Sequence, residues 1–447
     1  MPTHADILLQ QLSREPRTAR QLAAVLSVSQ PTLSRLLATL GDEIVRFGAA
    51  RSIQYTRRDS SRGLPDIAVY RADADGRLRR LGLLVPVYPE GFVMRQDDGK
   101  TLYSDGLPWW LYDMRPQGYL GRAYAARYGA ALQLPERLVD WTDTHALRAL
   151  LAHGGDGVGN LLLGDMAREH FLASPAPTPI NADQKNAAYG QLAREAAQGE
   201  IPGSSAGGEQ PKFTVYAVTA DGPQHLIVKF SEREAGPVTE RWRDLLLAEH
   251  LALTTLREAG VPAAQTWIVD ADDQRFLEVE RFDRVGPLGR RGVFSLAALD
   301  AEFVGAGTGT WPSIAARLAV SGEIRPQALQ GTELLWAFGV LIGNTDMHNG
   351  NVSFVSEHGR PYELAPAYDM TPMAFAPSRA GGLPDTLNEA NLHPSVANET
   401  WRRAEELANR FLARLRITPG FSDRFQPCLA ALENHLTVAR AQIARMG

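Results

Sequence analysis

The chain has a single cysteine, Cys428, among 447 residues, and no apolar run reaches the length of a membrane span. One cysteine excludes an internal disulfide framework and fits a reducing compartment. The net charge of -5 argues against a protein that coats nucleic acid along its whole length and against a disordered chain. Met1 to Leu12 lacks the basic and apolar segments of a secretory signal, so we expect a cytoplasmic protein with no membrane partner.

At 447 residues the chain exceeds what one hydrophobic core normally supports, so it is expected to fold as several domains. Short β-type runs alternate with turn signals after residue 66, and helical patterns dominate the last third, which predicts an α+β protein. The predicted domains are residues 1–59, 60–285 and 286–447.

Residues 1–58 carry the pattern of a winged helix-turn-helix. Thr18 and Ser29 are predicted N-caps of the second and third helix, and only two residues separate these helices. A two-stranded wing is then expected to turn at Gly48. The segments that carry the expected helices are 4–12, 18–28 and 29–40, with Ser27 and Val28 as the connection between the second and third helix.

This head is predicted to bind DNA, and a winged helix used for protein contacts or dimerisation is the alternative. Eight arginines and four acidic residues give residues 1–58 a net charge of +4, which leaves -9 for the rest of the chain. The exposed side of the third helix and the wing carry side chains that reach base edges and phosphates. The predicted DNA-contacting residues are Gln30, Thr32, Ser34, Arg35 and Arg51, and Arg57 and Arg58 also suit phosphate contacts.

The segment 334–370 has the layout of an active site, because an apolar helix breaks at Gly343 into a loop crowded with Asn and Asp. Asp346 and Asn351 stand in the D-x-x-x-x-N relation of a protein-kinase catalytic loop. A hairpin then delivers Asp369. Phosphoryl transfer needs one carboxylate to deprotonate the acceptor, and an Asn and a second carboxylate to hold magnesium. Asp346 is therefore the predicted general base, and Asn351 and Asp369 the predicted Mg²⁺ ligands.

Two other interpretations of this loop stay open. Asp346, His348 and Asp369 also suit a transition metal, and an Asn/Asp-rich turn without chemistry is common where a helix ends. A single histidine among many oxygens favours magnesium, with His348 as a supporting residue.

The stretch IPGSSAGGEQPKFTVYAV, 201–218, is the nucleotide-loop candidate, in which Gly203, Gly207 and Gly208 let the backbone approach phosphate oxygens. Lys229 lies in the apolar strand pattern LIVKF that follows, and a lysine buried there needs an anion such as ATP phosphate. The alternative is an edge-strand lysine that protects against aggregation. Glu249, in the next helix, is placed to pair with Lys229, as the αC glutamate does in kinases.

These motifs resemble the HipA-like kinases, the toxin kinases of bacterial toxin-antitoxin systems. The resemblance covers most of the chain after residue 60, and it rests on SSAGGEQPK, VKF, VERFDR, GNTDMHNGNVSF and LAPAYDM in this order. It implies a two-lobed protein-kinase-like fold, the cofactors ATP and Mg²⁺, and a protein substrate carrying Ser or Thr. It also supports Glu280 to Phe282 as the connection that offers backbone groups to adenine, although Arg281, Asp283 and Arg284 equally suit an ion-paired turn.

The resemblance further implies that Ser205 is autophosphorylated, which expels the loop and switches the enzyme off, with Ser204 as the alternative acceptor. A phosphate there adds about two negative charges to a loop that receives ATP phosphates, so it opposes nucleotide binding. In the toxin-antitoxin pairs the DNA-binding part belongs to a separate antitoxin, and the fused head suggests self-contained regulation.

The predicted function is therefore an ATP- and Mg²⁺-dependent serine/threonine kinase with a DNA-binding head, and homo-oligomerisation is left open. One alternative is a transcription regulator whose kinase-like body senses a nucleotide without transferring phosphate. The other is a small-molecule kinase, which shares the phosphate apparatus and differs in its acceptor pocket.

Overall fold

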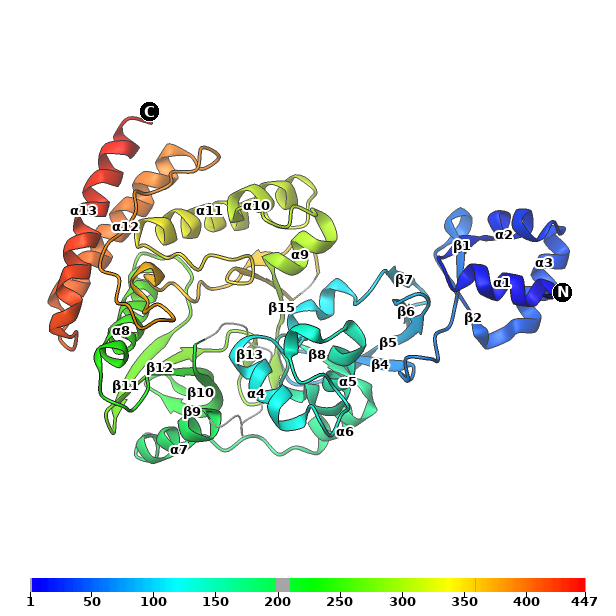
Figure 1. Cartoon of the computed structure of the whole chain (residues 1–447), viewed down its shortest axis with the longest axis horizontal. Helices are drawn as coiled ribbons and strands as arrows, with labels where there is room; N and C mark the ends of the chain where they lie inside the picture. The colour runs from blue at the N-terminus through cyan, green and yellow to red at the C-terminus, as the bar shows by residue number, and fades with distance from the viewer. Residues whose placement is uncertain (1, 198–209, 358, 447) are drawn as a thin grey trace.

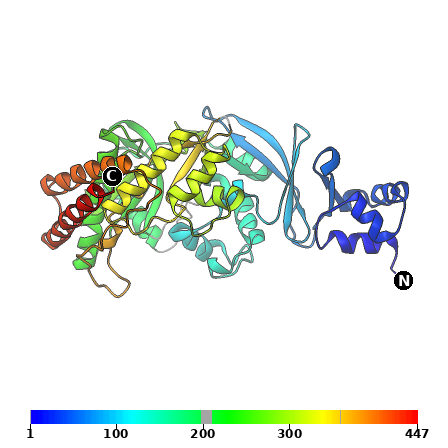
Figure 2. The same ribbon diagram turned by 90° about the horizontal axis from the view of Figure 1, so that it is seen from above.

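The computed structural model describes residues 2–197, 210–357 and 359–446. The parts of this α+β chain lie in a row, with the N-terminal helices at one end and the C-terminal helices at the other (Figure 1). Figure 2 shows the same order from above. Each helix in these ranges is too short or too polar to cross a lipid bilayer.

The N-terminal head is a winged helix-turn-helix. Thr18 and Ser29 accept hydrogen bonds from the backbone N–H groups three residues on, at 3.3 and 3.4 Å, so both predicted N-caps are confirmed. Gly48 has a φ of +82° where the wing turns, as predicted. The head consists of α1 (His4–Leu12), β1 (Arg17–Thr18), α2 (Ala19–Leu26), α3 (Gln30–Leu40), β2 (Ile44–Phe47) and β3 (Gln54–Arg57), with strand order β1-β3-β2.

The middle region is the predicted meander, closed by one further strand. Gly76 and Gly99 turn it at φ values of +78° and +86°, which glycine adopts without strain. Its antiparallel sheet has the order β7-β6-β5-β4-β8. The elements are β4 (Ile67–Ala72), β5 (Leu78–Val87), β6 (Gly91–Gln96), β7 (Thr101–Ser104), the 3-10 helix η3 (Trp109–Met114), α4 (Gly118–Tyr128), α5 (Asp143–His153), β8 (Leu161–Leu163) and α6 (Gly164–Ala173).

The wing packs directly on the middle sheet. The ring of Phe47 stacks on Tyr103 with centroids 4.8 Å apart, and the Gly48 N–H donates to Thr101 Oγ1 at 2.8 Å. Val45 and Phe47 share one buried cluster with β5 and β6. The head and the middle region therefore meet through an apolar contact and not only through the chain that joins them.

The chain between head and middle region is anchored as well. Arg62 pairs with the buried Asp59 at 2.8 Å and donates to the carbonyl groups of Val87, Glu90 and Gly91. The segment 60–66 is polar in composition, but these bonds tie it to β5 and β6. A buried guanidinium with this many acceptors fixes the exit of the wing.

The next part is a small lobe built on an antiparallel sheet of order β11-β12-β10-β9. Asp272 and Asp273, which turn the chain between the antiparallel strands β11 and β12, have φ values of +47° and +64°. Asp tolerates this left-handed region better than most residues. The elements are α7 (Lys185–Ala197), β9 (Lys212–Thr219), β10 (Gly222–Phe230), α8 (Pro237–Glu258), β11 (Thr266–Ala271) and β12 (Gln274–Glu280).

The larger lobe is mostly helical, as predicted, and it packs with α8 in one continuous buried cluster. Gly343 ends the apolar helix with a φ of +75°, which is the predicted break. A small sheet has the order β15-β16-β17. The elements are β13 (Arg284–Val285), β14 (Gly289–Arg290), β15 (Gly292–Ser295), α9 (Leu296–Phe303), α10 (Trp311–Val320), α11 (Pro326–Leu341), β16 (Ser353–Ser356), β17 (Glu363–Leu364), α12 (Asn398–Ile417) and α13 (Gln426–Ala444).

The connection between the lobes forms the ion-paired turn that was one of its two predicted roles. Asp283 accepts from Arg281 at 3.0 Å and from Arg284 at 2.7 Å, and both arginines also reach Asp156 of the middle region at 2.8 Å. Burial opposes ionisation, but the two guanidinium groups lower the pKa of Asp283 well below its usual range. The ion pairs of Asp156 therefore hold the middle region against the segment that connects the two lobes.

Candidate active site between the lobes

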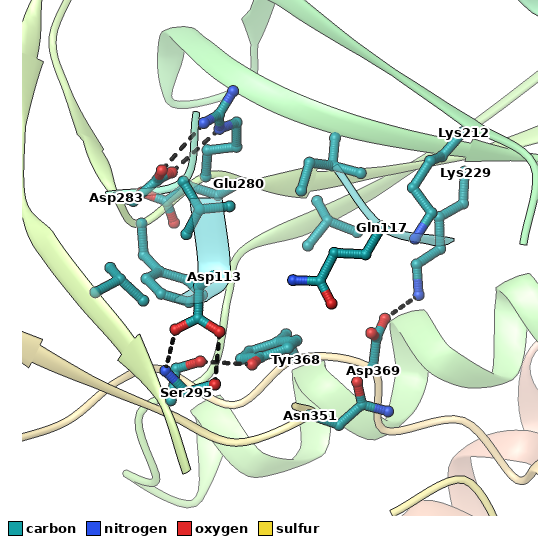
Figure 3. Close-up of a pocket in the computed structure, with 17 residues that line it drawn as sticks. Asp113, Gln117, Lys212, Lys229, Glu280, Asp283, Ser295, Asn351, Tyr368 and Asp369 are labelled. Atoms are coloured by element: carbon teal, nitrogen blue, oxygen red, sulfur yellow. Dashed lines mark hydrogen bonds and ion pairs between the residues drawn. The ribbon is translucent and has the colours of Figure 1, made fainter. Parts of the chain in front are cut away.

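A cavity between the small and large lobes collects side chains from three parts of the chain. Five predicted residues line it: Lys229, Glu280, Phe282, Asn351 and Asp369. Figure 3 shows Glu280 on one side of this cavity and Lys229 with Asp369 on the other. These residues are far apart in the sequence and belong to separate elements, and the fold brings them together around one cavity.

Lys229 joins the sheet to α8 and to the large lobe. Strand alternation buries Val228 and Phe230 in the core of the small lobe and turns Lys229 toward the cavity. The Lys229 Nζ donates to both carboxylate oxygens of Glu249, at 2.7 and 2.8 Å, and to Asp369 Oδ1. The predicted contact between Lys229 and Glu249 is therefore confirmed, and Lys229 belongs to a central strand and not to a sheet edge.

The charges of this group support one another. Burial opposes a charged lysine, but the carboxylates of Asp369 and Glu249 raise the pKa of Lys229 above its usual value. Burial also opposes a charged Asp369, yet Lys229 and Lys212 lower the pKa of that carboxyl group. Each charge therefore stabilises the other, which offsets the cost of burial.

The loop after α11 is held by its asparagines. The side chain of Asn344 donates to the Asp369 carbonyl at 3.1 Å and accepts from the Asp346 N–H at 3.0 Å. Asn351 Nδ2 donates to the Asp346 carbonyl at 2.8 Å. These bonds fix the backbone of Asp346 from both sides, while its side chain is exposed and lies outside the residues that line the cavity.

Asn351 and Asp369 offer oxygen ligands next to each other on the Lys229 side of the cavity (Figure 3). Asp369 has a φ of +53°, a strained conformation for a non-glycine residue that Asn344 and Lys229 hold in place. An amide and a carboxylate oxygen are hard ligands that suit Mg²⁺, whose remaining positions are usually filled by phosphate and water. The residues present therefore fit this ion.

The transition-metal alternative has no support in the same region. Within the described ranges, no three His, Cys, Asp or Glu side chains lie close enough to hold a metal ion, so Asp346, His348 and Asp369 do not form such a set. His348 is exposed, its Nδ1 accepts from the Gly350 N–H at 3.0 Å, and its carbonyl accepts from Trp311.

The predicted residues Ser205, Gly207 and Gly208, and the alternative acceptor Ser204, lie outside the described residues. Their predicted roles as phosphorylation site and phosphate loop stay predictions.

Lys212, Asp113 and Gln117 are among the cavity-lining residues that the sequence did not single out. Lys212 sits directly opposite Lys229 in the register of β9 and β10, and its position at the start of a strand pattern beside the glycine-rich stretch was a usable signal. Asp113 and Gln117 come from the middle region, more than 100 residues before Lys229. No local pattern connects them with the lobes, so only the fold identifies them.

In the head, Gln30, Ser34 and Arg35 are exposed along α3. Thr32 is half-buried, and its hydroxyl shares a 2.9 Å hydrogen bond with the N-cap Ser29. The side chain of Arg51 lies outside the described part of the structure, so its DNA contact stays a prediction.

Arg57 and Arg58, by contrast, contact their own chain. Arg57 donates to Ser13 Oγ at 3.1 Å and covers the Tyr88 ring, and Arg58 pairs with Asp66. The suggestion that both arginines serve phosphates stays a prediction.

Family models match three consecutive parts of the chain. Residues 6–43 match the bacterial regulatory protein, arsR family; residues 64–172 match the YjjJ-like toxin, middle domain; and residues 204–431 match the HipA-like C-terminal domain. The chain is also 39% identical over 444 residues to Toxin YjjJ of Escherichia coli (strain K12), with 99% of each chain covered.

Among solved structures, the fold is similar to a chain of the Shewanella oneidensis MR-1 toxin-antitoxin complex of HipA, HipB and its operator DNA. The TM-score is 0.50 at 16% identity, and the match covers 85% of this chain and 97% of that chain. At this identity the likeness concerns the fold alone. Together with the family models and the relative that matches along its full length, it shows that the chain belongs to the HipA-like toxins, in the form that carries its own N-terminal helix-turn-helix.

Proposed function

We propose that this HipA-like toxin is an ATP- and Mg²⁺-dependent serine/threonine protein kinase that can autophosphorylate Ser205. The observation that carries the proposal is the contact of Lys229 with both Glu249 and Asp369, beside Asn351, in one cavity between two lobes. This is the arrangement that phosphoryl transfer needs to position phosphates and neutralise their charge.

Each group has a distinct task in this proposal. Lys229 contacts the ATP phosphates, and Gly207 and Gly208 cradle them with backbone N–H groups. The connection from Glu280 to Phe282 offers backbone groups to adenine. Asn351 and Asp369 hold Mg²⁺, which supplies positive charge to the phosphate oxygens when it is bound.

Asp346 accepts the proton of the attacking hydroxyl. Its exposed side chain is accessible to a protein substrate, because it lies outside the cavity lining while its backbone is hydrogen-bonded to Asn344 and Asn351. A general base must reach the acceptor hydroxyl, which comes from solvent or from a docked substrate.

The test is transfer of labelled phosphate from ATP in the presence of Mg²⁺. Wild-type protein is expected to become labelled on Ser205, and Asp346→Ala and Asp369→Ala are each expected to lose at least 100-fold in rate. Asp75→Ala, in an exposed turn of the middle region, is the matched control. Ser204→Ala and Ser205→Ala, compared by mass spectrometry, identify the acceptor.

Other outcomes favour the alternatives. ATP binding without transfer to protein or small molecule supports a nucleotide-sensing regulator, and transfer to a small acceptor alone supports a small-molecule kinase. Either result overturns the protein-kinase proposal.

The head is proposed to bind DNA for self-regulation, through Gln30, Thr32, Ser34, Arg35 and Arg51. The Shewanella oneidensis HipA was solved with HipB and operator DNA, whereas here the helix-turn-helix belongs to the same chain as the lobes. A recognition helix with exposed Gln, Ser and Arg side chains fits the major groove.

A further inference from the structure

The middle region reaches into the cavity between the lobes. Asp113, near the end of η3, and Gln117, directly before α4, both line this cavity. Neither has a task in the phosphoryl transfer proposed above.

Asp113 fastens this part of the middle region to the large lobe. Its carboxylate accepts from the N–H and the hydroxyl of Ser295, both at 2.6 Å. The Ser295 hydroxyl in turn accepts from the Ala298 N–H and so caps α9. Four residues upstream of Asp113, the ring of Trp109 packs on Phe294 with centroids 4.9 Å apart. The chain that leads to Gln117 is therefore held at a fixed place beside the cavity.

The side chain of Gln117 has no structural task in the described part of the chain. It is the N-cap residue of α4, but its side chain makes no capping hydrogen bond, and no other described residue bonds its amide. A glutamine amide offers one acceptor and two donors. A half-buried amide that faces a cavity is stabilised by a ligand with both kinds of group.

The place of Gln117 in the cavity determines which part of a bound nucleotide its side chain would contact. Figure 3 shows its amide between Glu280 on one side and Lys229 and Asp369 on the other. In the proposed function adenine lies against Glu280 and the phosphates lie against Lys229 and Asp369. The group that joins adenine to the phosphates is the ribose, whose hydroxyls both donate and accept hydrogen bonds.

We propose that Gln117 binds the ribose hydroxyls of the nucleotide, so that the middle region completes the nucleotide site and selects ribonucleotides over deoxyribonucleotides. The inference rests on the proposed function, because it requires a nucleotide between the connection and Lys229. Asp113 is a positioning residue in this arrangement, because its carboxylate is taken up by Ser295.

The test is a comparison of ATP, 2′-deoxy-ATP and 3′-deoxy-ATP, each titrated with Mg²⁺ into the full chain by calorimetry. Wild-type protein is expected to bind at least one of the two deoxynucleotides about tenfold more weakly than ATP, the factor that one hydrogen-bonded group typically provides. Gln117→Leu is expected to bind ATP as weakly as that analogue and to bind the analogue with unchanged affinity.

Gln426→Leu, at an exposed position of α13, is the matched control and is expected to keep the wild-type preference. If Gln117→Leu does not fold, as judged by its melting curve, Gln117→Ala takes its place with the same expectation. Equal binding of all three nucleotides to wild-type protein, or an unchanged preference in the Gln117 variant, overturns the inference and leaves the proposed kinase intact. Absence of any ATP binding to wild-type protein overturns the proposed function itself.

Discussion

Lys229 shows how a single residue can connect three elements. Its ammonium group is buried, and it is stable there because Glu249 of α8 and Asp369 after β17 supply the opposite charge. Thr371 adds a hydrogen bond to Glu249 at 2.7 Å. Loss of Lys229 would leave two carboxylates uncompensated, so the ion pairs constrain the relative position of the two lobes.

The first prediction concerns the pH dependence of this contact. The pKa of Asp369 in the folded protein lies below its ordinary value of 3.8, so its ionised form stabilises the fold above about pH 4. This stabilisation is lost as the pH falls through the lowered pKa. Lys229 stays protonated throughout, because its own pKa is raised. The difference in unfolding free energy between wild type and Asp369→Asn is therefore expected to shrink as the pH falls below about 4.

Urea denaturation at a series of pH values measures this difference. Asp75→Asn controls for the loss of an exposed carboxylate. A gap between wild type and Asp369→Asn that stays constant down to pH 3 would contradict the assigned pairing.

Sequence reasoning predicts best the residues whose spacing is fixed along the chain. Asp346 and Asn351 share one loop, and Asp369 follows after a short hairpin, so the D-x-x-x-x-N spacing and the hairpin make their proximity predictable. The contact of Glu249 with Lys229 was predictable from the order of a strand followed by a helix. The place of Gln117 was not predictable, because it depends on how the middle region packs on Ser295, and no local periodicity encodes that contact.

At the scale of elements, short-range chemistry determined what the sequence could predict. The caps at Thr18 and Ser29 and the turn at Gly48 all depend on residues a few positions apart, and the structure confirms each of them. The contacts of Arg58 with Asp66 and of Arg62 with the carbonyls of β5 and β6 depend on tertiary packing. Arginines that look available for DNA in the sequence can therefore be committed elsewhere.

The second prediction tests α3 as the DNA-reading element. Arg35 is exposed on this helix, and its Nε makes only a long local contact of 3.4 Å with the Pro31 carbonyl. Arg35→Ala is expected to weaken binding to duplex DNA and, if Arg35 contacts phosphate, to reduce the slope of log affinity against log salt by about one. Fluorescence anisotropy between 50 and 200 mM salt, conditions chosen from the same relation, measures both effects.

Arg402→Ala is the matched control for this experiment, because Arg402 is exposed on α12 at the far end of the molecule (Figure 1). Equal affinity and equal salt slope for Arg35→Ala and wild type would remove α3 from the DNA interface and favour a head that contacts protein.

At the scale of the whole molecule, the parts are joined by packed contacts at each step. The wing shares a buried cluster with β5 and β6, Asp156 binds the arginines of the connection between the lobes, and Asp113 binds Ser295. Two like charges from Arg281 and Arg284 are tolerated because Asp156 and Asp283 lie between them. The head is therefore packed on the same middle region that lines the cavity between the lobes.

The third prediction tests the attachment of the head. Phe47 is 7% exposed and stacks on Tyr103, so Phe47→Ala removes an aromatic contact and leaves a cavity at the junction. The expected cost in unfolding free energy is about 3 to 5 kcal/mol for the unit that contains the wing. Val25→Ala is the matched control, because Val25 is 44% exposed on α2 and its truncation leaves no buried cavity.

Limited proteolysis is expected to cut Phe47→Ala, and not the control, within residues 58–66, while ATP affinity stays as in wild type. An uncut junction in Phe47→Ala would mean that the ion pairs of Arg58 and Arg62 hold the head without the aromatic stack, and a parallel loss of ATP affinity would mean that the head also supports the lobes.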